Sequence, residues 1–130
     1  MPPARDALTL SSDPAFLGEQ GLPNPEKLLL AAASSCQLLS FLAIAARSRV
    51  DVLAYDDEAE AIMPGDPKPM RITQIRLRPR IVVAADSNVA RVRRLVDRAH
   101  DGCFIANTLN AEMSIEPTIE LADGQTTGAS

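Results

Sequence analysis

Two cysteines are the residues of this chain best suited to chemistry. Cys36 lies inside the run from Asn24 to Arg47, and Cys103 follows it 67 residues later. They do not form a C-x-x-C pair, and the single histidine, His100, is too few for a typical zinc site. In a reducing compartment two such thiols are either inert packing residues or a working redox pair.

The run that holds the first cysteine predicts a long helix. Asn24 can cap it, and Pro25 suits the first helical position because its missing N–H would have no partner there. Glu26 and Arg47 lie at the ends where their charges suit the helix dipole. No charged residue occurs from Leu28 to Ala46, so we expect a central helix that is buried on all sides.

A membrane span is the alternative interpretation of this run. About 20 apolar residues cross a bilayer, and the run is close to that length. Its centre, where a span is normally most apolar, holds a polar notch. We therefore favour a core helix. The notch consists of Ser34, Ser35, Cys36, Gln37 and Ser40.

A reactive Cys36 would need help from its surroundings. A cysteine with an ordinary pKa of about 8.5 is mostly protonated at neutral pH, and burial raises that pKa. The residue is about eleven positions into the helix, so the dipole at the N-terminus contributes little. We expect a neighbouring cation, and the candidates are Arg5, Arg47 and Arg49. Cys103 is the only other thiol that could act as a partner.

The rest of the chain predicts strands and a second helix around the long one. That order predicts an α+β fold, with residues 1–121 as one domain and residues 122–130 as a disordered polar tail. Strands are expected at Ala7–Ser11, Val50–Met63, Arg71–Ala84 and Glu112–Leu121, a helix from Asp86 or Ser87 to about Asp101 with a stop at Gly102, and a short helical turn through Asn110.

The stretch from Arg71 to Ala84 alternates cleanly between apolar residues and arginines. The arginines would point outward, where they could pair with outward glutamates of the last strand or bind an anion. We favour an ordinary solvated charge row over an anion site. Pro79 suits an edge or a bulge. The apolar set is Ile75, Leu77, Ile81 and Val83, and the arginines are Arg76, Arg78 and Arg80.

Composition narrows the function classes. The chain has 130 residues, of which 46% are hydrophobic, as expected for one globular domain. The net charge is −4, only 3% of residues are aromatic and there is no Trp, which argues against general nucleic-acid binding. The N-terminus lacks the apolar core of a secretory signal. We expect a cytoplasmic protein with no nucleic-acid or membrane partner.

The segments NPEKLLLAAASSC and CFIANTLN resemble the OsmC/Ohr family of thiol-dependent peroxidases. An acidic residue ten positions before the first cysteine and a second cysteine after the next helix both fit the family pattern. The resemblance covers about Arg5 to Ile119. It implies an OsmC-like α+β fold, with mixed or antiparallel sheet strands around a long central buried helix, built as an intertwined homodimer.

The resemblance also implies an activity, the reduction of organic hydroperoxides to alcohols. No bound cofactor is implied, and an external dithiol such as dihydrolipoamide would regenerate the enzyme. By position, Cys36 would be the peroxidatic cysteine and Cys103 the resolving one. Glu26 would be the acidic partner, and Arg5 the active-site arginine.

The chain departs from the family pattern at three positions. Only four residues precede Arg5, where the family has a strand or hairpin. Gln37 stands where close relatives often have His, and Phe104 where better-studied members have Pro. The alternative function is therefore a non-catalytic OsmC-like dimer that binds a hydrophobic ligand. His100 could assist the second thiol, but we favour a capping or packing role.

Overall fold

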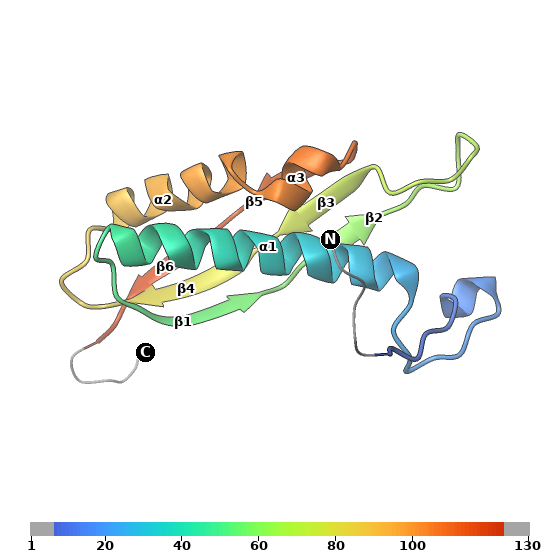
Figure 1. The fold of residues 1–130 in the computed structure, drawn as a ribbon, viewed down its shortest axis with the longest axis horizontal. Coiled ribbons are helices and arrows are strands. Elements are labelled where there is room, and N and C mark those ends of the chain that lie inside the picture. The colour runs from blue at the N-terminus through green and yellow to red at the C-terminus, as the bar shows by residue number, and fades with distance from the viewer. Residues whose placement is uncertain (1–6, 124–130) are drawn as a thin grey trace.

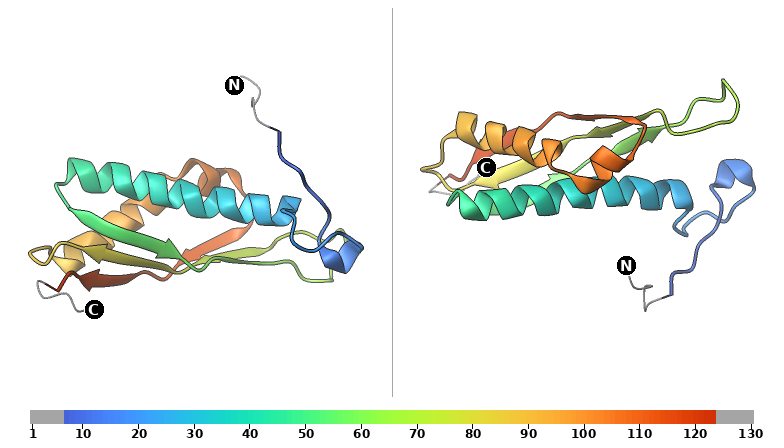
Figure 2. Two further views of the ribbon diagram at one scale, coloured as in Figure 1. Left: turned by 90° about the horizontal axis from the view of Figure 1, so that it is seen from below. Right: turned by 45° about the horizontal axis from the view of Figure 1, so that its top comes forward.

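The computed structural model describes residues 7–123. The predicted α+β class is confirmed, and α1 runs along most of the molecule with α2 and α3 beside it (Figure 1). The segment from residue 7 to residue 23 extends away from the body at the end where α1 begins (Figure 2). Helical elements are η1 (Pro14–Phe16), α1 (Pro25–Arg47), α2 (Val89–Asp101) and α3 (Phe104–Thr108).

The long helix begins and ends where the sequence predicts. The Asn24 side chain accepts a hydrogen bond of 2.8 Å from the backbone N–H of Lys27, which satisfies one of the free amides of the first turn. Pro25 occupies the first turn, and Arg47 the last. With 23 residues, α1 is about 34 Å long, enough to contact both sheets.

Burial of α1 on all sides, however, is not found within the single chain. One stripe is buried against the sheets and α2, whereas Leu39 is 66% and Leu42 37% exposed on the opposite side. The helix is long and apolar enough to cross a membrane, a test that core helices also meet. Its opposite side lacks a cover because this small two-layer fold has sheets on one side only of α1. The buried stripe is Ala33, Gln37, Phe41 and Ala45.

Three of the predicted strands each divide between two sheets. Each sheet has three strands, in the orders β1-β4-β6 and β2-β3-β5, with one antiparallel and one parallel pairing in each. Pro79 opens the central strand of the first sheet instead of lying at an edge, which is compatible with its missing N–H because it is the first residue of that strand. The strands are β1 (Val52–Asp57), β2 (Glu60–Ile62), β3 (Gln74–Leu77), β4 (Pro79–Val83), β5 (Glu112–Ile115) and β6 (Thr118–Leu121).

The predicted alternation along β3 and β4 is confirmed, since all four of its apolar residues are fully buried. In β1, by contrast, a bulge between Val52 and Ala54 changes which residues share a face. Val52 and Tyr55 therefore pack on the core, and Leu53 is 54% exposed. Leu121 is 45% exposed at the end of β6.

The outward arginines pair with carboxylates, as the cross-strand interpretation predicted. Arg80 binds Glu120 through two hydrogen bonds of 2.7 and 2.9 Å. Arg78 lies 2.9 Å from Glu60, and Arg76 contacts the same carboxylate at 3.4 Å. Because carboxylates already neutralise these guanidinium groups, the row is not an anion site.

Two expected boundaries are wrong. Ala7–Ser11 forms no strand, because no neighbouring strand pairs with it and only Ser11 donates a backbone bond, to Pro23. The cap of α2 is Asn88, whose side chain accepts from the N–H of Arg91 at 3.0 Å. The stop at Gly102 and the short helix after it are confirmed.

We predict that Phe41→Ala destabilises the fold strongly. Phe41 is fully buried at the centre of the larger core cluster, and removing a buried Phe typically lowers the free energy of unfolding by about 3–5 kcal/mol. Leu53→Ala, at an exposed position of β1, is the matched control and should change it by less than about 1 kcal/mol. Chemical denaturation measures both, and similar losses would contradict the core assignment.

Candidate functional site

The two cysteines come together where the end of α2 meets the middle of α1. Gly102 ends α2, and Cys103 follows it as the N-cap of α3. Cys103 is fully buried, and its sulfur accepts a weak hydrogen bond of 3.5 Å from the N–H of Ala106. Its thiol lies within hydrogen-bonding reach of the Cys36 sulfur, and each changes the pKa of the other. Residues 67 positions apart thus form one dithiol site.

Four hydrogen-bond donors surround the Cys36 sulfur. They are the Cys103 thiol, the Ser40 hydroxyl, and the backbone N–H groups of Ile105 and Phe104 in the first turn of α3. The hydroxyl belongs to the next turn of α1, four residues after Cys36, where helical geometry brings it alongside the thiol. A short helix therefore supplies to this sulfur the free amides that the middle of α1 cannot.

These donors favour the ionised form of Cys36. Burial raises the pKa of the Cys36 thiol, but the hydrogen bonds from Cys103, Ile105, Phe104 and Ser40 together outweigh it and hold the pKa below its ordinary value. Burial thus acts on the pKa as predicted, but among the described residues hydrogen-bond donors lower it in place of the expected cation. The Ser40 donor could have been found from its i+4 spacing, whereas the backbone amides of α3 have no side-chain signature.

The pKa of the second thiol is shifted in the opposite direction. Burial raises the pKa of Cys103 first, and the neighbouring Cys36 sulfur raises it further. Cys36 therefore ionises at a lower pH than Cys103. A thiolate beside a thiol is the arrangement needed for a nucleophile and its disulfide partner.

Cys36 opens into an apolar groove of about 660 Å³ between α1, the end of α2 and α3. Leu39 and Ile44 of α1 line it, and Phe104 and Ile105 form the side that belongs to α3. Phe104 is 83% exposed. An alkyl group that entered this groove would gain free energy by leaving water.

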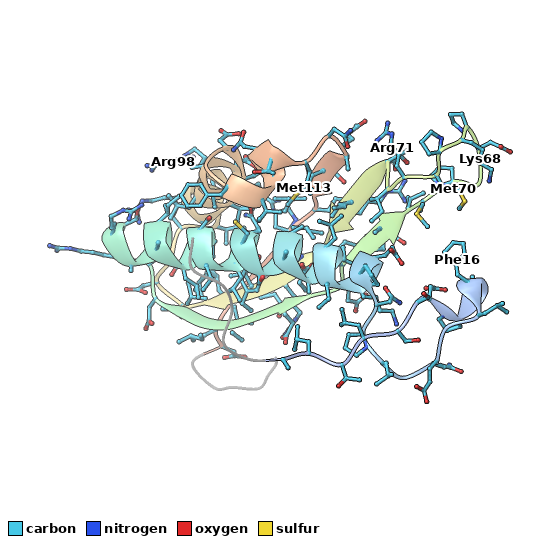
Figure 3. The ribbon with its side chains drawn as sticks, turned by 45° about the vertical axis from the view of Figure 1, so that its right-hand side comes forward. Phe16, Lys68, Met70, Arg71, Arg98 and Met113 are labelled. Carbon is cyan, nitrogen blue, oxygen red and sulfur yellow. The ribbon has the colours of Figure 1, made fainter. Side chains whose placement is uncertain are left out.

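Glu26 does not reach Cys36 within one chain. It is ten residues earlier on the same helix, which corresponds to about 15 Å along the axis. It lines a separate pocket of about 280 Å³, together with Phe16 of η1 and Met70 of the β2–β3 loop, at the far end of the molecule (Figure 3). Arg5 lies outside the described residues.

The other charged candidates are placed as follows. Arg47 lines the groove of Cys36, and Arg49 lines a different, polar pocket. His100 uses its backbone carbonyl to accept from the N–H of Cys103 at 3.2 Å, while its buried Nδ1 has no hydrogen-bond partner among residues 7–123. Within the same range no cluster of His, Cys, Asp and Glu could hold a metal ion.

Comparison with known proteins identifies the class. The family described as OsmC-like protein matches residues 18–118. An OsmC-like protein of unknown function from Vibrio cholerae has a solved structure that is 33% identical, with a TM-score of 0.76, over 82% of this chain and 73% of that one. This chain therefore belongs to the OsmC-like family, which confirms the resemblance seen in its sequence.

Two further relatives extend the comparison. The solved structure of an organic hydroperoxide resistance protein OsmC from Legionella pneumophila is 20% identical, with a TM-score of 0.69, over 87% of this chain and 80% of that one. It shows that the fold is shared. The uncharacterized protein YmaD of Bacillus subtilis is 27% identical over 103 residues, 75% of this chain and 69% of its own length.

We predict that the Ser40 hydroxyl helps to keep Cys36 ionised. The thiolate is the species that reacts with iodoacetamide, so the lowered pKa should bring the alkylation rate of Cys36 to its plateau at a lower pH than for an ordinary cysteine. Ser40→Ala removes one donor and should move this profile to higher pH. Peptide mass spectrometry separates alkylation of Cys36 from that of Cys103.

Ser35→Ala is the matched control for this experiment. Ser35 is on the same helix, but its hydroxyl donates to the backbone carbonyls of Ala31 and Ala32. This variant should keep the wild-type pH profile. If Ser40→Ala also kept it, the hydroxyl would have no part in stabilising the thiolate.

Proposed function

We propose that the protein is a thiol-dependent peroxidase that reduces organic hydroperoxides to alcohols. The observation that carries this proposal is the dithiol itself: Cys36 has four hydrogen-bond donors, a lowered pKa and an apolar groove, and Cys103 lies beside it. Membership of the OsmC-like family supports it, because relatives that share the fold are named organic hydroperoxide resistance proteins.

The first step oxidises Cys36. Its thiolate attacks the outer oxygen of the hydroperoxide, a sulfur–oxygen bond forms and the oxygen–oxygen bond breaks. Sulfur gives up two electrons and becomes a sulfenic acid, and the alkoxide takes a proton from water and leaves as the alcohol. The donors around the sulfur favour the thiolate before the attack.

The second step uses Cys103. Its sulfur attacks the sulfenic sulfur, its proton leaves with the hydroxyl group as water, and the Cys36–Cys103 disulfide forms. An external dithiol such as dihydrolipoamide then reduces this disulfide by exchange and becomes a disulfide itself. The chemistry needs no bound cofactor, and it suits a reducing compartment such as the cytoplasm.

The proposal includes a homodimer, because the remaining side chains of the site must come from elsewhere. Glu26 is about 15 Å from Cys36 along α1, and the outer side of that helix is not covered within the single chain. Two α1 helices packed antiparallel about a two-fold axis would cover part of this side and bring Glu26 of the partner subunit to Cys36. There it would orient Arg5 through a charge-assisted pair.

A second function, binding of a hydrophobic ligand without catalysis, is favoured by one observation. The groove is apolar and large, and both Leu39 and Phe104 expose most of their surface along it. In such a protein the two thiols would never react. Thiol chemistry separates the two functions directly.

We predict that one equivalent of an organic hydroperoxide consumes both thiols of the wild-type protein. Cys36→Ser should abolish turnover. Cys103→Ser should be oxidised once and then stop, leaving a sulfenic acid that dimedone labels. Thiol titration and mass spectrometry follow each step. Mild and equal losses in both variants, or no thiol loss in the wild type, would support the binding protein instead.

We further predict that two inactive variants complement each other. Glu26→Ala and Cys36→Ser homodimers should both have little activity. Refolded together, half of the dimers should be mixed, and each mixed dimer has one intact site, so about a quarter of wild-type activity should return. Light scattering gives the oligomeric state. A monomeric mass, or no recovery in the mixture, would contradict the shared site.

A further inference from the structure

The hydroxyl of Ser40 lies beside the open side of the Cys36 sulfur. Ser40 follows Cys36 by one turn of α1, about 6 Å along the axis and about 40° around it, and both residues line the same groove. Its hydroxyl donates to the Cys36 sulfur. The groove continues along α1 in the same direction, past Ala43 and Ile44. Ser40 therefore lies where the sulfur meets the rest of the groove.

The groove is the side from which a hydroperoxide can reach the Cys36 sulfur. Cys103 is fully buried on the inner side of this sulfur, and the first turn of α3 supplies the amides of Phe104 and Ile105. A thiolate attacks a peroxide in line with the oxygen–oxygen bond, because the reacting orbitals must align. The leaving oxygen therefore points away from the sulfur and into the groove.

Negative charge moves during this attack from the sulfur to the leaving oxygen. The sulfur gives up electrons to the attacked oxygen, and the leaving oxygen becomes negative as its bond breaks. The amides of Phe104 and Ile105 are fixed in the backbone beside the sulfur. The hydroxyl of Ser40 can rotate and turn its proton from the sulfur to the leaving oxygen. A hydrogen bond that is made only in the transition state raises the rate of the step.

The other polar side chains of the groove are placed less well for this role. Ser35 lines the groove, but its hydroxyl donates to the carbonyl of Ala31 at 2.6 Å. It lies about 100° around the helix from Cys36, compared with about 40° for Ser40. Arg47 also lines the groove, but it is about 16 Å from Cys36 along the axis. Among residues 7–123, Ser40 is therefore the side-chain donor best placed for the leaving oxygen.

We infer that Ser40 is a further catalytic residue, whose hydroxyl donates a hydrogen bond to the leaving oxygen while Cys36 attacks the hydroperoxide. The inference rests on the proposed peroxidase function. A sulfur–oxygen bond forms, the oxygen–oxygen bond breaks, and the sulfur gives two electrons to the peroxide. The proton of Ser40 stays on Ser40, and water supplies the proton that converts the alkoxide into the alcohol. The hydroxyl lowers the barrier by stabilising the charge that develops on the leaving oxygen.

The choice of leaving group separates this role from the effect of Ser40 on the ionisation of Cys36. tert-Butyl hydroperoxide releases an alkoxide, which is a strong base, whereas peracetic acid releases acetate, a carboxylate that is stable at neutral pH. Both oxidation rates are measured at a pH where alkylation of Cys36 by iodoacetamide has reached its plateau, so that the thiol is fully ionised in every protein. Each reaction is stopped with acid, and mass spectrometry counts the oxidised Cys36.

We expect Ser40→Ala to slow the oxidation of Cys36 by tert-butyl hydroperoxide about tenfold or more, and to leave the rate with peracetic acid nearly unchanged. The loss should be smaller than in a closed oxyanion site, because water can enter the groove and donate instead. Ser40→Thr keeps a hydroxyl and should keep the wild-type ratio of the two rates. Ser35→Ala removes the other hydroxyl of the groove and should also keep this ratio.

The same measurements distinguish failure of this inference from failure of the proposed function. If tert-butyl hydroperoxide oxidised wild-type Cys36 no faster than free cysteine, the protein would not be a peroxidase, and the role of Ser40 would fail with that function. Rapid oxidation of the wild type, together with equal losses for the two peroxides or no loss in Ser40→Ala, would leave the proposed function standing and overturn the role of Ser40.

Discussion

The packing of α2 against α1 is the contact on which the site depends. It places the turn at Gly102 beside the middle of the long helix, and with it the Cys103 thiol and the first amides of α3. A hydrogen bond of 3.2 Å from the Gln37 side chain to the carbonyl of Val96 links the two helices one residue away from Cys36. Both partners are buried, so loss of this bond would leave polar groups unsatisfied in the core.

The polar notch of α1 serves two sides of the helix at once. Cys36 and Ser40 face the groove. On the other side the Ser34 hydroxyl donates to Asp57 at the end of β1, and Asp57 also accepts from the backbone N–H of Arg78 at 2.8 Å. Arg78 is the residue between β3 and β4, where the chain leaves one sheet for the other. One part of the notch thus attaches the helix to the sheets, and the other part helps to lower the pKa of Cys36.

Sequence patterns predicted the positions of the helices and strands better than the pairing between strands. The bounds of α1 and the buried alternation of β3 and β4 follow from local chemistry, namely a cap, a first-turn proline and a period of two. The division of the strands between two sheets and the bulge at Leu53 depend on neighbouring strands, which no single segment encodes. For the site, the side chains of Cys36 and Cys103 were found, but the lowered pKa of Cys36 depends partly on backbone amides of α3, whose position only the tertiary structure determines.

The outer face of α1 can provide both a helix contact and the groove beside Cys36, because the helix is long. Leu39, Leu42 and Phe104 are exposed in the single chain, and a contiguous apolar surface of this kind marks an interface or a ligand site. A partner helix placed by the Glu26–Cys36 pairing would cover only the N-terminal part of α1, because it would end opposite residue 37. The remaining ten residues, at about 1.5 Å each, extend about 15 Å beyond the partner helix, and this apolar helix surface ends at Arg47. A shorter α1 could provide the helix contact or this apolar surface, but not both.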